Sequence, residues 1–212
     1  MNNSSVKPVY DRIPKNRVAT IGAPILVLLL AVSFLANSSS PTSPAKSFSS
    51  ITIKNFGQMD EHFYRGAQPS DNEYKELADL GVKTIIDLRD DPMPYAKGAA
   101  ESVKLAYFNI PMSDKDYPKD ADIDAFLKLS NDEHNWPFYV HCAGGRHRTG
   151  VMAALYRFNH DHWNYDQVYA EMKQYDFYTS NGHGKQLDFV QDYWQMSQAR
   201  KATSTVSATA NH

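Results

Sequence analysis

The residues best suited to catalysis lie in one short segment, residues 141–150, which read HCAGGRHRTG. This segment contains Cys142, the only cysteine of the chain, and five residues separate it from Arg148. A loop of this length can wrap around one tetrahedral oxyanion with its backbone N–H groups pointing inward, and a helix that begins at its far side adds the positive end of its dipole. The spacing therefore predicts a phosphate-binding loop at a strand-to-helix turn.

Each side chain in this loop has a chemical task that its type can perform. Inward amides, the helix N-terminus and Arg148 all lower the pKa of a thiol, so we expect Cys142 to be a thiolate nucleophile. The fork of Arg148 can hold two phosphate oxygens and stabilise their charge in the transition state. Thr149 can donate a hydrogen bond to the sulfur, and we expect His141 to orient the loop rather than act as a base. The segment predicts a phosphomonoester hydrolase that forms a cysteinyl-phosphate intermediate and needs no metal or cofactor.

Turnover also needs a proton donor for the leaving oxygen, which usually comes from another loop. Residues 110–119, IPMSDKDYPK, form a polar, proline-flanked stretch after a strand-like segment. We expect Asp114 to be the general acid, with Asp116 as the second candidate. If neither serves, the chain is a phosphate-binding pseudophosphatase without catalytic activity.

Alternating strands and helices must position these loops. Near-continuous apolar strands that alternate with helices indicate a mostly parallel, buried central sheet flanked by helices, with ligands at the carboxyl ends of the strands. Ser70 to Glu73 form a capping box that opens a helix ending at Gly81. Further helices are expected over residues 94–103, 121–130, 148–160, 164–175 and 185–198, and strands over residues 82–88, 104–110 and 137–141.

Three segments together resemble the cysteine-dependent dual-specificity protein phosphatases, in particular their atypical plant and fungal branch and its bacterial relatives. They are the loop HCAGGRHRTG, the upstream FYRGAQPS at 63–70 and GVKTIIDL at 81–88. The resemblance covers about residues 56–177. The family commonly has lysine in the cradle at the position where this chain has Arg146.

The resemblance implies the cysteine-dependent phosphatase fold and the role of each motif residue. Cys142 is implied as nucleophile, Arg148 as phosphate clamp and Asp114 as the acid. The implied substrate-binding cradle consists of the backbone of Ala143, Gly144, Gly145, Arg146 and His147, together with Arg148. The implied substrates range from phosphotyrosine or dual-specificity phosphoprotein targets to small molecules such as inositol polyphosphates and phospholipid headgroups.

Composition agrees with one catalytic domain, which we expect at residues 51–198. The chain has 212 residues, is 42% hydrophobic and carries a net charge of −2. Such a balance gives no global basic surface for nucleic acid, so we expect no nucleic-acid partner and only local attraction for phosphate.

The two ends of the chain differ from this domain. Residues 1–17 are basic, residues 18–36 form an uncharged apolar stretch, and residues 37–50 are rich in serine and proline. Nineteen apolar residues can span a bilayer, and positive charge before them keeps the N-terminus in the cytoplasm. We therefore expect a transmembrane anchor at 18–36, a linker at 37–50 and a single-pass membrane protein with its catalytic domain on the extracytoplasmic side. Cleavage would instead yield a secreted or periplasmic protein. Residues 199–212 are expected to be a disordered tail.

Overall fold

A five-stranded mixed sheet forms the centre of the domain. The computed structural model describes residues 48–209. The strands lie in the order β1-β2-β5-β3-β4, so that β5 occupies the middle of the sheet. They are β1 (Gly57–Gln58), β2 (Phe63–Gly66), β3 (Thr84–Arg89), β4 (Ala106–Met112) and β5 (Phe138–His141).

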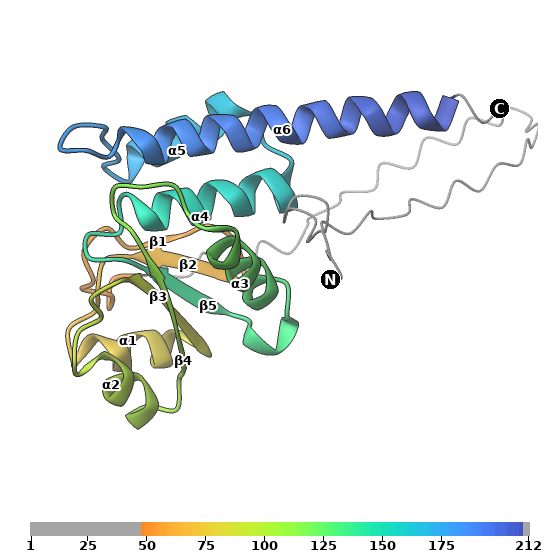
Figure 1. Ribbon diagram of the computed structural model, residues 1–212. Helices are drawn as coiled ribbons and strands as arrows, with labels where there is room; N and C mark the ends of the chain where they lie inside the picture. Colours follow the sequence, from red (N-terminus) through yellow and green to blue (C-terminus); the bar gives the residue numbers. More distant parts are fainter. Residues whose placement is uncertain (1–47, 210–212) are drawn as a thin grey trace, which may run out of the picture.

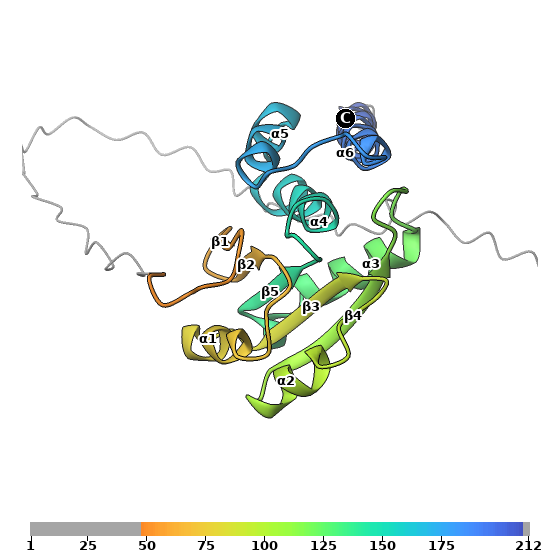
Figure 2. The ribbon, with the colours of Figure 1, turned by 90° about the vertical axis from the view of Figure 1, so that its left-hand side faces the viewer.

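Helices cover both faces of this sheet (Figures 1 and 2). The short helices α1 (Glu73–Leu80) and α2 (Ala96–Ser102) lie on one face. On the other face lie α3 (Asp120–Ser130) and α4 (Arg148–Tyr156), with α5 (Tyr165–Gln174) and α6 (Gly184–Thr209) packed outside α4. Because both faces are covered, all residues of β2 and β5 are buried, which explains the apolar character of PFYVH.

The parallel strand register sets where the loops emerge. His141, the last residue of β5, pairs with Gly66 of β2 on one side and with Asp87 of β3 on the other. The carboxyl ends of these three strands therefore meet at one edge of the sheet. The loop that follows Cys142 leaves the sheet at this edge, where open α/β sheets bind their ligands.

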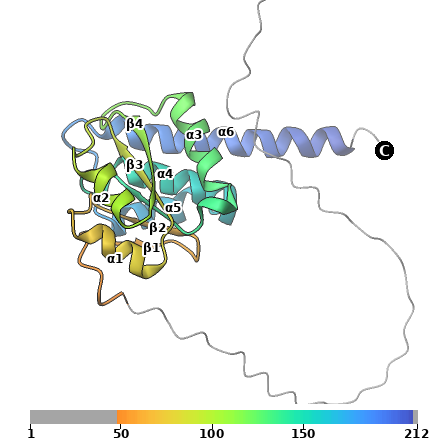
Figure 3. The same ribbon diagram turned by 90° about the horizontal axis from the view of Figure 1, so that it is seen from below.

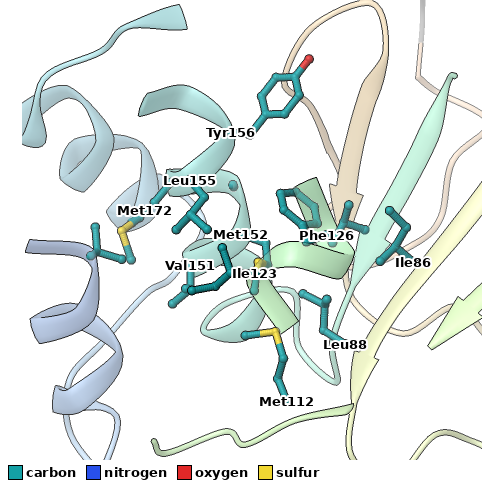
Figure 4. Close-up of a cluster of buried hydrophobic side chains, with 14 of the residues drawn as sticks. Ile86, Leu88, Met112, Ile123, Phe126, Val151, Met152, Leu155, Tyr156 and Met172 are labelled. Carbon is teal, nitrogen blue, oxygen red and sulfur yellow. The ribbon is translucent and has the colours of Figure 1, made fainter. Parts of the chain in front are cut away.

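The larger hydrophobic core lies between the sheet and the helices α3 to α6. Figure 4 shows Ile86 and Leu88 of β3 beside Phe126 of α3 and Met152 of α4, all buried. Removing one such aromatic side chain, as in Phe126→Ala, would destabilise the domain by about 3–5 kcal/mol. This packing makes α4 a rigid base for the loop that precedes it.

Several helix boundaries agree with the signals expected from sequence. The Glu73 carboxylate accepts a hydrogen bond of 2.6 Å from the Ser70 amide, which is one half of the predicted capping box. Gly81, with φ of 95°, ends α1 in the left-handed conformation. The helix behind the phosphate loop differs from expectation, because α4 ends at Tyr156 and continues as a π-helical turn over Arg157–Asp161. The Arg157 guanidinium holds this turn by bonds to Glu171 and Asp161.

The predicted mostly parallel sheet is confirmed, because only the edge strand β1 runs antiparallel to its neighbour, β2. The fold class needs one correction. Within residues 48–209, no helix is both long enough and apolar enough to cross a membrane; the longest, α6, carries Asp188, Asp192 and Arg200 along its length. The segment 18–36 lies outside the described residues. The described residues therefore do not support the predicted N-terminal transmembrane segment or the single-pass localisation inferred from it.

The C-terminal helix is longer than expected. The sequence predicts a helix over 185–198 followed by a disordered tail, whereas α6 continues to Thr209. Its second half projects beyond the rest of the domain (Figures 1 and 3). Residues 1–47 and 210–212 lie outside the description, and the segments expected there remain predictions.

Candidate active site

The phosphate loop connects the central strand β5 to the first residue of α4, Arg148. Gly145 has φ of 68°, and a Cβ at this position would collide with the backbone of Gly66. Only glycine therefore lets the loop pack so closely against the end of β2. A backbone hydrogen bond of 3.2 Å from Gln68 to the Ala143 carbonyl ties the two segments together.

Cys142 lies at the base of this loop and is 4% exposed. Burial alone would raise the pKa of its thiol, and this is the largest single influence. Hydrogen bonds from the hydroxyl and amide of Thr149, the charge of Arg148 and the Gly145 amide oppose it, and together they bring the pKa below its ordinary value of 9.0. The buried Thr149 hydroxyl has no nitrogen or oxygen partner among the described residues, so the sulfur is the acceptor available to it. The loop thus favours the thiolate.

Two side chains from outside the motif support the loop from below. Arg65 is fully buried and donates a hydrogen bond of 2.9 Å to the Gly145 carbonyl. Its guanidinium lies over the Tyr175 ring, 3.9 Å from the centroid. Burial lowers the pKa of Arg65 to about 10, which still leaves a cation at neutral pH. Asn55 donates to the Gly144 carbonyl at 3.2 Å and to the Tyr175 carbonyl at 3.1 Å.

His141 and Asp87 form a fully buried pair beside the nucleophile. The Nδ1 atom of His141 lies 3.7 Å from Asp87 Oδ1 and 3.4 Å from the Cys142 carbonyl. Burial lowers the pKa of His141 more than Asp87 raises it, so the ring is neutral. The Asp87 carboxylate is in turn held by the Tyr107 hydroxyl at 2.6 Å. A buried, neutral His141 ring can orient the loop. It is not placed to exchange protons with substrate as a base.

Arg148 is anchored along one edge of its guanidinium. Its Nη1 atom donates to Asp90 Oδ1 at 2.6 Å and to the Met112 carbonyl at 3.1 Å, and its side chain is only 7% exposed. Among the described residues the hydrogen bonds of this side chain all start from Nη1. The opposite edge, Nε and Nη2, is therefore the one that can hold two phosphate oxygens. Asp90 was not identified as a site residue from the sequence. Its position directly after β3, at the carboxyl end of a parallel strand, could have indicated a place near the site.

The side chains of two cradle residues, Arg146 and His147, point in different directions. Arg146 is 44% exposed and lies 3.8 Å from Asp176. His147 instead turns inward, where its Nε2 atom donates to the Tyr178 carbonyl at 3.1 Å. Burial, followed by His183, lowers the pKa of His147 to about 4, so this ring is neutral. The side chain of His147 thus supports the loop from within, and only its backbone faces the cradle.

The structure also separates the two candidate acids. Asp116 is exposed and accepts a bond of 2.6 Å from Lys185 of α6, which lowers the pKa of its carboxyl. Asp114 is half-buried, and its negative charge is close enough to His147 to act on the pKa of that ring. Asp114 therefore lies within electrostatic reach of the phosphate loop, whereas the Asp116 carboxylate is paired with Lys185 of α6.

Comparison with known proteins places this site in a family. Residues 43–192, more than half of the chain, match the family described as PTP-NADK, a DSP-PTPase phosphatase fused to NAD+ kinase. The inositol diphosphatase DSP3 of Arabidopsis thaliana is 32% identical over 114 residues, which cover 49% of this chain and 53% of DSP3. The dual specificity protein phosphatase TpbA of Pseudomonas aeruginosa is 29% identical over 144 residues, which cover 67% of this chain and 64% of TpbA. The chain thus matches between half and two thirds of the length of these two relatives.

Solved structures share the fold. The core catalytic domain of the PP-IP phosphatase SIW14 from S. cerevisiae matches with a TM-score of 0.60 at 20% identity, covering 72% of this chain and 93% of that structure. TpbA matches with a TM-score of 0.57 at 24% identity, covering 69% and 91%. This structural similarity establishes a common fold. The match to the family over residues 43–192 establishes which family the chain belongs to. The chain belongs to the DSP-PTPase family and is a cysteine-dependent phosphatase of the protein-tyrosine and dual-specificity type.

Proposed function

We propose that Cys142 is the nucleophile, Arg148 the phosphate clamp and Asp114 the general acid of this phosphatase. The observation that carries the proposal is a buried thiol at the base of the loop, where hydrogen bonds from Thr149 and Gly145 and the charge of Arg148 favour the thiolate. In the first step the thiolate attacks phosphorus in line and forms the S–P bond while the P–O bond to the leaving group breaks. The loop amides and the Nε/Nη2 edge of Arg148 hold the equatorial oxygens, and Asp114 gives its proton to the leaving oxygen.

The second step regenerates the enzyme. Asp114, now a carboxylate, takes a proton from a water molecule whose oxygen attacks phosphorus, and the S–P bond breaks to release inorganic phosphate. The sulfur leaves as a thiolate, which the Thr149 hydroxyl stabilises. That no metal or cofactor takes part remains a prediction.

For the substrate, we propose a phosphomonoester with one phosphate group, such as a phosphotyrosine side chain. Apart from the phosphate clamp Arg148, several cations around the site are ion-paired with aspartates: Arg146 with Asp176, Arg89 with Asp91 and Lys185 with Asp116. A polyphosphate needs several cations that are free to bind it, and these pairs leave few. One solved structure of the relative TpbA is a complex with pTyr, which agrees with this choice.

Inositol polyphosphates are the second candidate, because DSP3 is named an inositol diphosphatase and SIW14 a PP-IP phosphatase. A side-by-side assay decides between them. Purified full-length chain is given a phosphotyrosine peptide, a phosphoserine peptide, an inositol polyphosphate and a phospholipid headgroup, and phosphate release is measured. We expect the highest kcat/KM with the phosphotyrosine peptide. A higher value for the inositol polyphosphate would overturn the substrate assignment and leave the mechanism intact.

The mechanism itself is tested with p-nitrophenyl phosphate. Cys142→Ser should abolish turnover, because a serine hydroxyl is not ionised at neutral pH, and should keep vanadate binding by the loop amides. Wild-type chain that binds vanadate and releases no phosphate would identify a pseudophosphatase. A Cys142→Ser variant with full activity would refute the cysteine mechanism.

A further inference from the structure

The turn between α5 and α6 docks against the loop that carries Asp114. His183 is buried, and its Nδ1 atom lies 2.7 Å from the Asp114 carbonyl. Three residues later, Gln186 donates to the Ser113 carbonyl at 3.2 Å. Two consecutive backbone carbonyls of the acid loop, Ser113 and Asp114, are therefore held by side chains from a segment about seventy residues away in the sequence.

His183 also contacts the phosphate loop. Its ring stacks on the His147 ring with centroids 3.6 Å apart and planes 8° from parallel. A carbonyl oxygen only accepts hydrogen bonds, so Nδ1 of His183 and Nε2 of His147 each carry a proton and donate it, to Asp114 and Tyr178 respectively. These bonds fix the orientation of both rings. His183 is thus the one described side chain that both stacks on the phosphate loop and bonds the backbone of the proposed acid.

We propose that His183 is a positioning residue that holds Asp114 at the correct place relative to Cys142. The inference rests on the proposed role of Asp114 as general acid. Next to Asp114, Ser113 is polar and only half-buried and Lys115 is exposed, so the loop has little apolar contact at this point to define its position. A proton donor that is displaced by about 1 Å can lose up to about 10²-fold in rate. A bond to the backbone of Asp114 itself, combined with a stack on the other catalytic loop, prevents that displacement.

Two substitutions separate the two contacts of His183. His183→Phe keeps a ring that can stack on His147 and removes the donor to the Asp114 carbonyl. His183→Asn keeps an N–H donor near the position of Nδ1 and removes the stack. Asn159→Leu serves as the matched control, because it deletes a half-buried bond of 2.9 Å to Tyr193, which lies farther along α6 than Gln186 and makes no hydrogen bond to Ser113 or Asp114.

The readout is the dependence of kcat/KM on the leaving group, measured for the full-length chain. Phenyl phosphate releases a phenolate as basic as that of tyrosine and needs the acid, whereas 2,4-dinitrophenyl phosphate releases a weakly basic anion and does not. We expect His183→Phe to lose roughly tenfold with phenyl phosphate and less than about twofold with the dinitrophenyl ester. His183→Asn should recover most of this loss, and Asn159→Leu should change both substrates equally or not at all.

Asp114→Asn, measured in parallel, separates failure of this inference from failure of the proposed function. If Asp114→Asn shows the leaving-group dependence and His183→Phe lowers both substrates by the same factor, His183 is only structural and the inference is wrong. If Asp114→Asn itself lacks the dependence, the proposed acid is wrong. Circular dichroism and thermal melting of each variant identify a loss of folded protein, which would lower both substrates together.

Discussion

The phosphate loop and the acid loop reach the same site by different physical means. The phosphate loop lies within one continuous segment, between a fully buried strand and a buried helix, and Gly145 packs directly against the backbone of β2. The acid loop is largely exposed and is held by Lys185, His183 and Gln186, which lie around the start of α6. The phosphate loop is fixed mainly by close backbone packing between β5 and α4, with Arg65 and Asn55 bonded beneath it, whereas the acid loop depends mainly on side chains from around the start of α6.

This difference predicts two classes of defect. Damage to the phosphate loop should slow every substrate by a similar factor, because each one is held by the same amides and guanidinium. Damage to the acid loop should depend on the leaving group, because only a basic leaving oxygen needs a proton in the transition state. The following substitutions test this contrast, from the largest expected effect to the smallest.

Of these substitutions, Arg148→Lys should lower kcat/KM the most. Lysine offers a point charge without the two-pronged edge and cannot reproduce both the anchor to Asp90 and the grip on phosphate. We expect kcat/KM to fall by about 10³ for phenyl and dinitrophenyl phosphate alike. A loss confined to phenyl phosphate would show that Arg148 acts through the acid loop. Arg148 donates a hydrogen bond to the carbonyl of Met112, the residue just before Ser113.

Asp114→Asn and Asp116→Asn should behave differently although the residues are two apart. We expect Asp114→Asn to lose about 10² in kcat/KM with phenyl phosphate and little with the dinitrophenyl ester. Asp116→Asn breaks an exposed pair with Lys185 and should stay within about twofold of wild type, because such pairs contribute little. The reverse result would assign the acid to Asp116.

Arg65→Met tests support of the phosphate loop from below. The substitution removes the bond to the Gly145 carbonyl and should lower kcat/KM by about tenfold for both esters. The substitution also leaves the buried Gly145 carbonyl without this donor, so the free energy of unfolding should fall by about 1–3 kcal/mol. A large drop in unfolding free energy with unchanged activity would give Arg65 a purely structural role.

The smallest effect concerns the ionisation of Cys142. Because its folded-state pKa is lowered, inactivation by iodoacetamide should reach half its maximal rate at a pH below 9.0. Thr149→Val deletes a donor to the sulfur, so the pKa should rise and the midpoint should shift to higher pH. Inactivation at neutral pH should then slow by a few-fold, about the effect of one ordinary hydrogen bond, because the amides and Arg148 still stabilise the thiolate. A midpoint that does not move would show that the amides and Arg148 alone stabilise the thiolate.

The same contrast explains which features could be predicted from sequence. The phosphate loop was predictable because Cys142, Gly145 and Arg148 lie within one short segment whose spacing matches the size of a phosphate group. Strands β3, β4 and β5 and the helices between them were predictable from their apolar periodicity. The strand β2 was missed, because its four residues include Arg65, which is buried only by virtue of Gly145 and Tyr175.

The residues that serve the acid loop could not be predicted in this way. Asp114 and Asp116 follow the same strand in the same polar stretch, and only contacts to His183 and Lys185 distinguish them. Those contacts bridge 69 positions of the chain, and no local pattern encodes them. Asp90 was missed for a related reason, because its role is visible only once Arg148 is placed beside it.

The central claim, a covalent cysteinyl phosphate on Cys142, is tested most directly by trapping that intermediate. Full-length chain is mixed with a labelled phosphotyrosine peptide, quenched in acid within one turnover, digested and analysed by mass spectrometry. For the wild type we predict one phosphoryl group on Cys142. In Asp114→Asn, given a dinitrophenyl ester, this intermediate should accumulate further, because the variant lacks the base for the second step. Phosphate release without any label on Cys142, or label on another residue, would contradict the account.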